Sequence, residues 1–191
     1  TDLNISFGNA DINSIVSGKI SLNYSELGLG NTSSLEVESK SSTLNIAIAD
    51  NLTINAKRDK YFINQLKVLN GKSSFSYVTV KSFKSDLILE TDYGKVTVEN
   101  VSPEFKLIDL TSSFTDIILK LPGNTSFLTD ISHNSSTQIN APGSYSGLKT
   151  EIIDKKNELY HTKGTAGNGT INKGRINMKC TSGKIIFQEI E

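Results

Sequence analysis

Two aspartates stand at a spacing that could bring their carboxylates together. Asp109 and Asp130 are 21 residues apart, and a chain that repeats at this interval would place them at the same position of neighbouring coils. Paired carboxylates at a working separation cleave glycosidic bonds by acid–base or nucleophilic chemistry. Asp116, however, falls elsewhere on such a coil, and aspartate is common at corners and on strand surfaces. We therefore expect ordinary surface residues and a protein that is not an enzyme.

The histidines and the cysteine add little further chemistry. His133 and His161 are isolated in turn-like sequence without a partner at metal-ligand or triad spacing, so we expect both to lie exposed in loops. Cys180 is the single cysteine and shares the parity of Ile176 and Met178, which predicts a small buried side chain. Calcium-binding repeats of the Gly-Gly-x-Gly-x-Asp type do not occur in the sequence. The sequence thus predicts neither a metal nor a cofactor.

Cationic and aromatic residues gather in the irregular segment 56–65, AKRDKYFINQ. Such a group can contact an acidic glycan through charge and ring stacking. A solvated loop with Phe62 turned inward is the competing interpretation. A further aromatic residue stands between two serines in a glycine-flanked loop, where we expect it to be exposed. The predicted binding residues are Lys57, Arg58, Lys60, Tyr61 and Tyr145.

The stretch 85–121 indicates which elements must position these groups. Apolar and polar residues alternate along it, as is typical of short strands with one buried face. Successive strands begin near residues 87, 96, 105 and 117, and Asp, Gly, Asn, Pro and Ser fill the gaps between them. Each predicted strand must therefore turn a corner almost at once.

Apolar residues also recur about every 21 residues over much of the chain. One series is Leu22, Leu44, Leu66, Leu87, Leu107 and Leu128, and a second is Ile54, Phe75, Val96 and Ile117. A pattern of glycine, a basic residue, a β-branched residue, any residue and an apolar residue begins at Gly18, Gly94, Gly174 and Gly183. It predicts corners at which glycine takes a positive φ.

Repeats of this length predict an all-β, single-domain β-solenoid, or β-helix, with coils of about 21 residues. An antiparallel β-sandwich is the alternative, since its strands have similar spacing. We expect regular coils over 1–142, an irregular excursion or hairpin over 143–170 that covers one end, and closing strands over 171–191. Within the excursion, 165–169 is predicted to be a flexible loop.

Composition narrows the choice of partners. The 20 Lys and Arg residues balance the 20 Asp and Glu residues, which gives no electrostatic reason to expect nucleic acid or an anionic membrane. Apolar runs stay below the roughly 18 residues of a membrane span. The chain begins at Thr1 without a charged or apolar leader, and we expect a targeting segment to have been removed.

Three segments together resemble a family of bacterial envelope proteins that are built from β-strand repeats and described as adhesins, a domain of unknown function. They are 87–98, with the corner Asp92-Tyr93-Gly94; 114–122, which ends in Leu-Pro; and 176–185, which contains Thr-Ser-Gly. The likeness covers 80–191, and the part of the chain before it only through periodicity. The corner Ser112-Ser113-Phe114 departs from the family's usual Gly-Asp or Ser-Gly.

The resemblance implies a β-solenoid at the bacterial surface, either secreted or in the cell envelope, with a role in cell adhesion. It supplies no catalytic residues. We expect a non-enzymatic adhesin or binding scaffold whose partner is a glycan or a surface protein. The alternative is a carbohydrate-binding module or carbohydrate-active enzyme on the same coil, which three converging carboxylates would favour. An envelope-stress component is a third interpretation, and the sequence predicts no particular oligomeric state.

Overall fold

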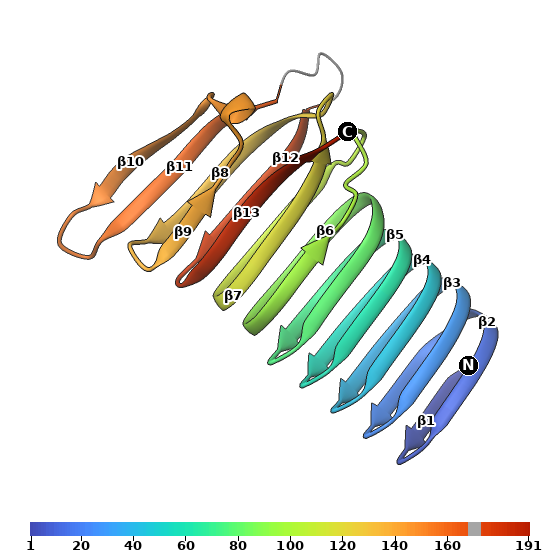
Figure 1. Ribbon diagram of the computed structural model, residues 1–191. Coiled ribbons are helices and arrows are strands. Elements are labelled where there is room, and N and C mark those ends of the chain that lie inside the picture. The colour runs from blue at the N-terminus through green and yellow to red at the C-terminus, as the bar shows by residue number, and fades with distance from the viewer. Residues whose placement is uncertain (168–172) are drawn as a thin grey trace.

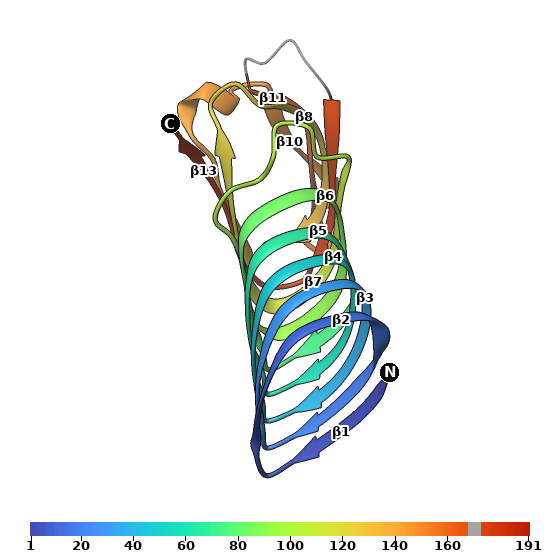
Figure 2. The same cartoon turned by 90° about the vertical axis from the view of Figure 1, so that its right-hand side faces the viewer.

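The computed structural model describes residues 1–167 and 173–191 and shows a parallel β-solenoid (Figure 1). The predicted fold class is therefore confirmed. The N-terminal part consists of β1 (Asp2–Ser6), β2 (Asn9–Asn23), β3 (Glu26–Lys40), β4 (Thr43–Lys57), β5 (Lys60–Ser74) and β6 (Tyr77–Val98). Each of β2 to β5 is one bent strand of 15 residues that makes a complete coil. A rounded bend lies at one edge of each coil and a sharp corner at the other (Figure 2).

The coils in this part repeat every 17 residues, as from Ser25 to Ser42 and from Ser42 to Asp59. The predicted length of about 21 is therefore wrong here. Leu27 aligns with Leu44, and a strand of 15 residues followed by a short corner accounts for the repeat. A spacing of 21 residues is found between β6 and β7, as from Asp92 to Ser113. Residues 99–106 lengthen that coil.

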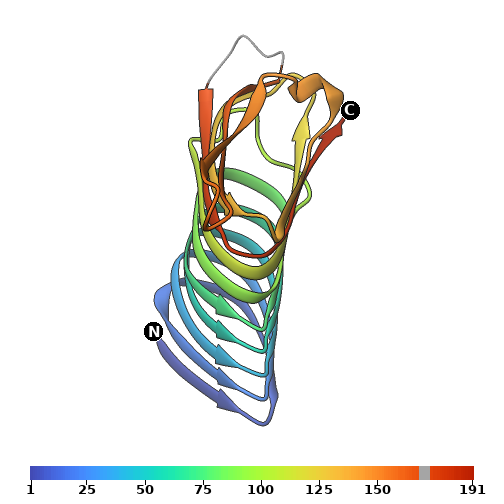
Figure 3. The same ribbon diagram turned by 90° about the vertical axis from the view of Figure 1, so that its left-hand side faces the viewer.

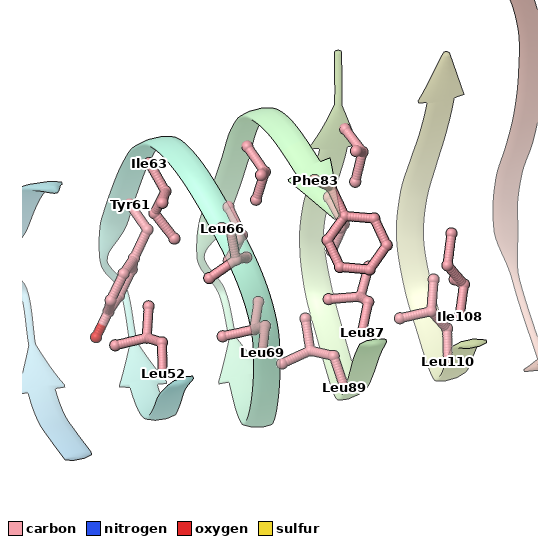
Figure 4. Packing of buried hydrophobic residues seen from close by; sticks show 14 of the residues in the cluster. Leu52, Tyr61, Ile63, Leu66, Leu69, Phe83, Leu87, Leu89, Ile108 and Leu110 are labelled. Carbon is pink, nitrogen blue, oxygen red and sulfur yellow. The ribbon is translucent and has the colours of Figure 1, made fainter. Parts of the chain in front are cut away.

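Apolar side chains from successive coils stack in rows inside the solenoid (Figure 4). One row on the face after the bend is Leu35, Leu52, Leu69, Leu87 and Ile108, each at most 2% exposed. Burial of each such side chain stabilises the fold by about 2 kcal/mol. The core is thus built one coil at a time from equivalent positions.

The C-terminal strands do not follow one another in space. β7 (Leu107–Pro122) is followed in sequence by β8 (Ser126–Asn134) and β9 (Thr137–Asn140). The last two strands, β12 (Lys173–Cys180) and β13 (Gly183–Ile190), lie between them: β12 pairs with β7 and β8, and β13 pairs with β7 and β9. The closing strands are therefore a coil inserted before the final one.

The excursion lies at the C-terminal end of the solenoid. It contains the short helix η1 (Gly143–Tyr145) and the hairpin of β10 (Leu148–Asp154) and β11 (Leu159–Ala166), which continues the sheet from β8 in antiparallel fashion. Thr165 and Ala166 belong to β11, whereas residues 168 and 169 of the predicted loop lie outside the described residues. Among the described residues, no helix is long and apolar enough to cross a membrane.

Substituting an inward residue of a row should unfold the domain. Val96 is fully buried opposite Ile117, and an unpaired buried carboxylate costs several kcal/mol, a large part of a typical stability of about 5–15 kcal/mol. We expect Val96→Asp to abolish the cooperative melting transition in circular dichroism. The adjacent, outward Thr97→Asp is the control and should melt like the wild type. A folded Val96→Asp variant with unchanged melting would contradict this core assignment.

Candidate functional site

Corners with a left-handed backbone join successive coils along one edge of the solenoid (Figure 3). Their φ angles lie between 47° and 61°, a region that side-chain-bearing residues rarely adopt. One residue per coil contributes, and we call this row the corner ladder: Phe7, Tyr24, Ser41, Arg58, Phe75, Tyr93 and Phe114. From Phe7 to Phe75 the members follow the coil repeat of 17 residues.

The predicted glycine corners are mostly wrong. Only Gly183 of the four has a positive φ, at 115°. Gly18 and Gly94 are needed for another reason, because a Cβ atom would lie 2.1 Å from the Thr1 carbonyl oxygen and 2.2 Å from that of Ser76, respectively. These glycines allow close approach of neighbouring coils instead of making the turn.

A buried hydroxyl after the corners at Tyr24, Ser41 and Phe75 ties neighbouring coils together. Ser42 Oγ donates to the Lys40 carbonyl oxygen at 3.0 Å and accepts the Ser25 N–H at 3.1 Å. Two coils further on, Ser76 Oγ accepts the Asp59 N–H at 2.9 Å and donates to the Ser74 carbonyl oxygen at 2.7 Å. Each of these serines therefore satisfies a backbone donor of the preceding coil at the point where strand pairing is interrupted.

Asp59 occupies the same position as these serines and is 1% exposed. Its carboxylate accepts the N–H groups of Ser42 and Lys57, both at 2.7 Å, and the Ser39 hydroxyl at 2.8 Å. Ser39 Oγ is in turn 2.5 Å from the Tyr61 hydroxyl. Burial raises the pKa of Asp59 above its ordinary value, although the three hydrogen bonds oppose that shift. The network places a buried acid directly beside the basic residues of the corner.

Aromatic side chains of the corner ladder stack on one another at the surface. Phe7 and Tyr24 stack with ring centroids 5.4 Å apart; Phe75, Tyr93 and Phe114 form a triplet with centroid steps of 5.0 and 4.7 Å. All five rings are 47–78% exposed. The Arg58 guanidinium lies over Phe75, 5.9 Å from its centroid. This edge is therefore an exposed, largely aromatic strip.

The structure places the predicted binding residues in two environments. Lys57, Arg58 and Lys60 are exposed together at the corner between β4 and β5. Tyr61 is fully buried and Phe62 is 45% exposed, the reverse of the expected orientation, because β5 begins at Lys60 and alternation then turns Tyr61 into the row of Leu27 and Leu44.

Tyr145 is also buried rather than exposed, at 3%. Its ring packs edge-on against Phe127, with centroids 5.4 Å apart, and also contacts Phe187. Burial raises the pKa of Tyr145 to about 12. Tyr145 thus closes the C-terminal end of the core, and a ligand at the surface would not reach it.

The two aspartates of the predicted pair, Asp109 and Asp130, lie in one row across the strands, with a residue of β12 between them. Asn177 of β12 aligns with Asp109 on one side and with Asp130 on the other. Asp116 lies elsewhere and accepts the Lys184 N–H at 3.1 Å. Within residues 1–167 and 173–191, no three His, Cys, Asp or Glu side chains gather where they could hold a metal ion.

Both histidines lie on strands, so the expected exposed loops are wrong. His133 of β8 is buried, 3.0 Å from Thr162 Oγ1, and its ring stacks with Tyr160. His161 of β11 is 2.7 Å from the Asp130 carboxylate. The buried Cys180 follows the prediction: it accepts a hydrogen bond from Ser112 Oγ at 3.0 Å, and burial raises the pKa of its thiol.

The sequence carried a signal for the corner ladder that the longer repeat concealed. Tyr24-Ser25 and Phe75-Ser76 share an aromatic residue followed by serine, and they are three coils apart. The longer repeat instead assigned Phe75 to an inward series. An exposed aromatic residue that recurs with a following hydroxyl marks this kind of corner.

The fold and the corner ladder together define a parallel β-solenoid with an exposed aromatic edge. Comparison of the chain with family models, with curated proteins and with solved structures finds no match. The resemblance to the adhesin family therefore stays a prediction.

Stability should depend on pH through Asp59. Because its folded-state pKa is raised, protonation favours the folded state; that contribution is present at low pH and is lost as pH rises through the folded-state pKa. Asp59→Ser restores the side chain of neighbouring coils and removes this titration. We expect wild-type stability, relative to Asp59→Ser, to increase as the pH is lowered from neutral into the acidic range in urea unfolding experiments. Parallel pH profiles would count against the assignment.

Proposed function

We propose that this chain is a non-enzymatic binding scaffold of the bacterial cell surface, adhesin-like in role, which holds its partner along the corner ladder. The observation that supports this most strongly is the exposure of five aromatic rings at backbone positions where an aromatic residue is unfavourable. Contiguous apolar surface of this kind typically marks an interaction site.

Stability alone is a weak explanation for these rings. A left-handed backbone costs a side-chain-bearing residue on the order of 1 kcal/mol relative to glycine. Each ring stack contributes about 0.5–1.5 kcal/mol, so stacking offsets the strain without a large surplus. Glycine or asparagine would make the same corner without exposing a ring to water. Exposure of the rings is explained if a partner covers them.

Ring geometry favours a protein partner over a glycan. In the Phe75, Tyr93 and Phe114 triplet the planes are within 6° of parallel, so the rings use their faces on one another. Along its length the strip exposes ring edges, which carry partial positive charge and can contact carbonyl oxygens and aromatic faces of a protein surface. Sugar stacking needs a free ring face, which the middle ring lacks.

A panel of surface proteins and glycans, probed with wild type and variants, tests this proposal. We expect saturable binding to a protein ligand that falls at least about tenfold in Phe75→Ser/Tyr93→Ser/Phe114→Ser, because buried aromatic contacts dominate interfaces. Ile152→Ser/Ile153→Ser, which removes exposed apolar residues of β10, is the matched control and should bind normally. All variants are first checked by melting.

Three outcomes would contradict the proposal. If the aromatic triple variant binds as tightly as the wild type, the triplet of the corner ladder is not part of the interface. Loss of binding in Lys57→Ala/Arg58→Ala/Lys60→Ala, with the aromatic variant unaffected, would place the interface on the basic residues alone. Saturable binding to glycans only would favour the carbohydrate-binding alternative.

A further inference from the structure

The corner ladder has one gap, at Ser41. The Ser41 backbone follows the same geometry as its neighbours: φ is 52°, and its N–H donates to the Lys57 carbonyl oxygen at 2.9 Å. The N–H groups of Tyr24 and Arg58 make the equivalent bonds at 3.0 and 2.9 Å. Ser41 is therefore a regular member of the ladder whose side chain is too short to reach the stack.

The gap has the dimensions of one aromatic ring. Its two borders, Tyr24 and Arg58, are two coils apart, which corresponds to roughly 9.5 Å. Phe75 and Phe114 are likewise two coils apart, and the ring of Tyr93 fills the space between them with centroid steps of 5.0 and 4.7 Å. A ring inserted over Ser41 would occupy a position like that of Tyr93 in the triplet.

The borders of the gap differ in chemistry. Tyr24 supplies an aromatic ring, already stacked on Phe7 on its other side. Arg58 supplies a guanidinium that Phe75 supports from beyond the gap. Lys40 and Lys57, both exposed, align with each other beside it. In the described part of the chain, none of these three basic residues forms an ion pair, so three cations surround the gap against the single buried carboxylate of Asp59.

We propose that the gap over Ser41 is a binding slot for a single aromatic ring that carries a negative charge. Tyr24 stacks on the ring, Arg58 contacts its other face, and Lys40 and Lys57 attract the anionic substituent. This inference rests on the proposed function and deepens it, since it assigns a ligand chemistry to the same edge. The ring could belong to a free aromatic acid or to a sulfated or phosphorylated tyrosine of a protein partner.

Titration with naphthalene-1-sulfonate, followed by amide chemical shifts in NMR, tests the slot. We expect saturable shifts at Ser41, Tyr24 and Arg58 with a Kd on the order of 1 mM. Cyclohexanesulfonate, which has the charge without the aromatic ring, should bind at least about tenfold more weakly. Neutral 1-naphthalenemethanol should also bind more weakly, because it lacks the charge.

Ser41→Tyr is the decisive variant, because it fills the slot from within. It should abolish the saturable shifts and raise the melting temperature by about 2 °C or more through the new stack. Ser41→Ala leaves the slot open and should bind like the wild type. Arg58→Gln should weaken binding several-fold. Binding that survives Ser41→Tyr, or no saturable shift in the wild type, would overturn the proposal.

A second arm separates the two sources of the ring. A short peptide with one sulfotyrosine is compared with the same peptide carrying tyrosine; preference for the sulfated form, lost in Ser41→Tyr, supports a modified protein partner. Binding of naphthalene-1-sulfonate with no binding of either peptide supports a free aromatic acid. If the wild type shows no saturable shift with naphthalene-1-sulfonate while the triplet variant still loses the protein partner found on the panel, the slot proposal fails and the proposed function stands.

Discussion

The structure depends on a buried polar side chain that follows each of four successive corners in the N-terminal part. At this point the chain reverses direction, strand pairing stops, and a backbone N–H of the preceding coil would be left unsatisfied in the interior. Ser25, Ser42, Asp59 and Ser76 solve this by accepting that N–H, with distances from 2.7 to 3.5 Å. An unsatisfied buried N–H costs about 1–3 kcal/mol, so a coil that returned one residue early or late would lose this bond as well as its core packing. The observed coil length is the one at which both are satisfied.

The constant coil length also determines which side chains are aligned at the surface. Because each coil places its corner residue directly above the last, side chains of the corner ladder meet at ring-stacking distance without long-range packing to position them. Ion pairs between outward rows, such as Lys72 with Glu90 at 2.7 Å, are exposed and stabilise little. The organised part of the surface is therefore the corner edge, where strain, exposure and regular spacing coincide.

Alternation was sufficient to predict strands and a solenoid, because inward and outward residues differ in hydrophobicity whatever the coil length. The repeat length failed for a physical reason. Each coil has several inward positions, so two apolar residues in adjacent coils need not be equivalent: Leu44 aligns with Tyr61, and Leu66 is a later inward residue of the same coil as Tyr61. At the candidate site, the clustering of the basic residues could be predicted because they are adjacent in sequence. Which of Tyr61 and Phe62 points into the core could not, because it depends on the residue at which β5 begins, Lys60. The closing strands over 171–191 were predicted as strands, but their insertion beside β7, ahead of β8 and β9, leaves no local signal in the sequence.

The insertion separates a part of the molecule that is built from local strand pairings from a part that is built from non-local ones. Up to β6, every pairing joins segments about one coil apart in sequence, so each coil can form on the previous one. Beyond β7 the arrangement is non-local: Ser112 meets Cys180 across 68 residues, and the final coil cannot take its place until the last strands are present. Most of the corner ladder, including the gap at Ser41, lies in the locally ordered part. Its spacing is therefore set by neighbouring coils alone, and a ring bound over Ser41 would be held between two surfaces whose separation does not depend on how the C-terminal end closes.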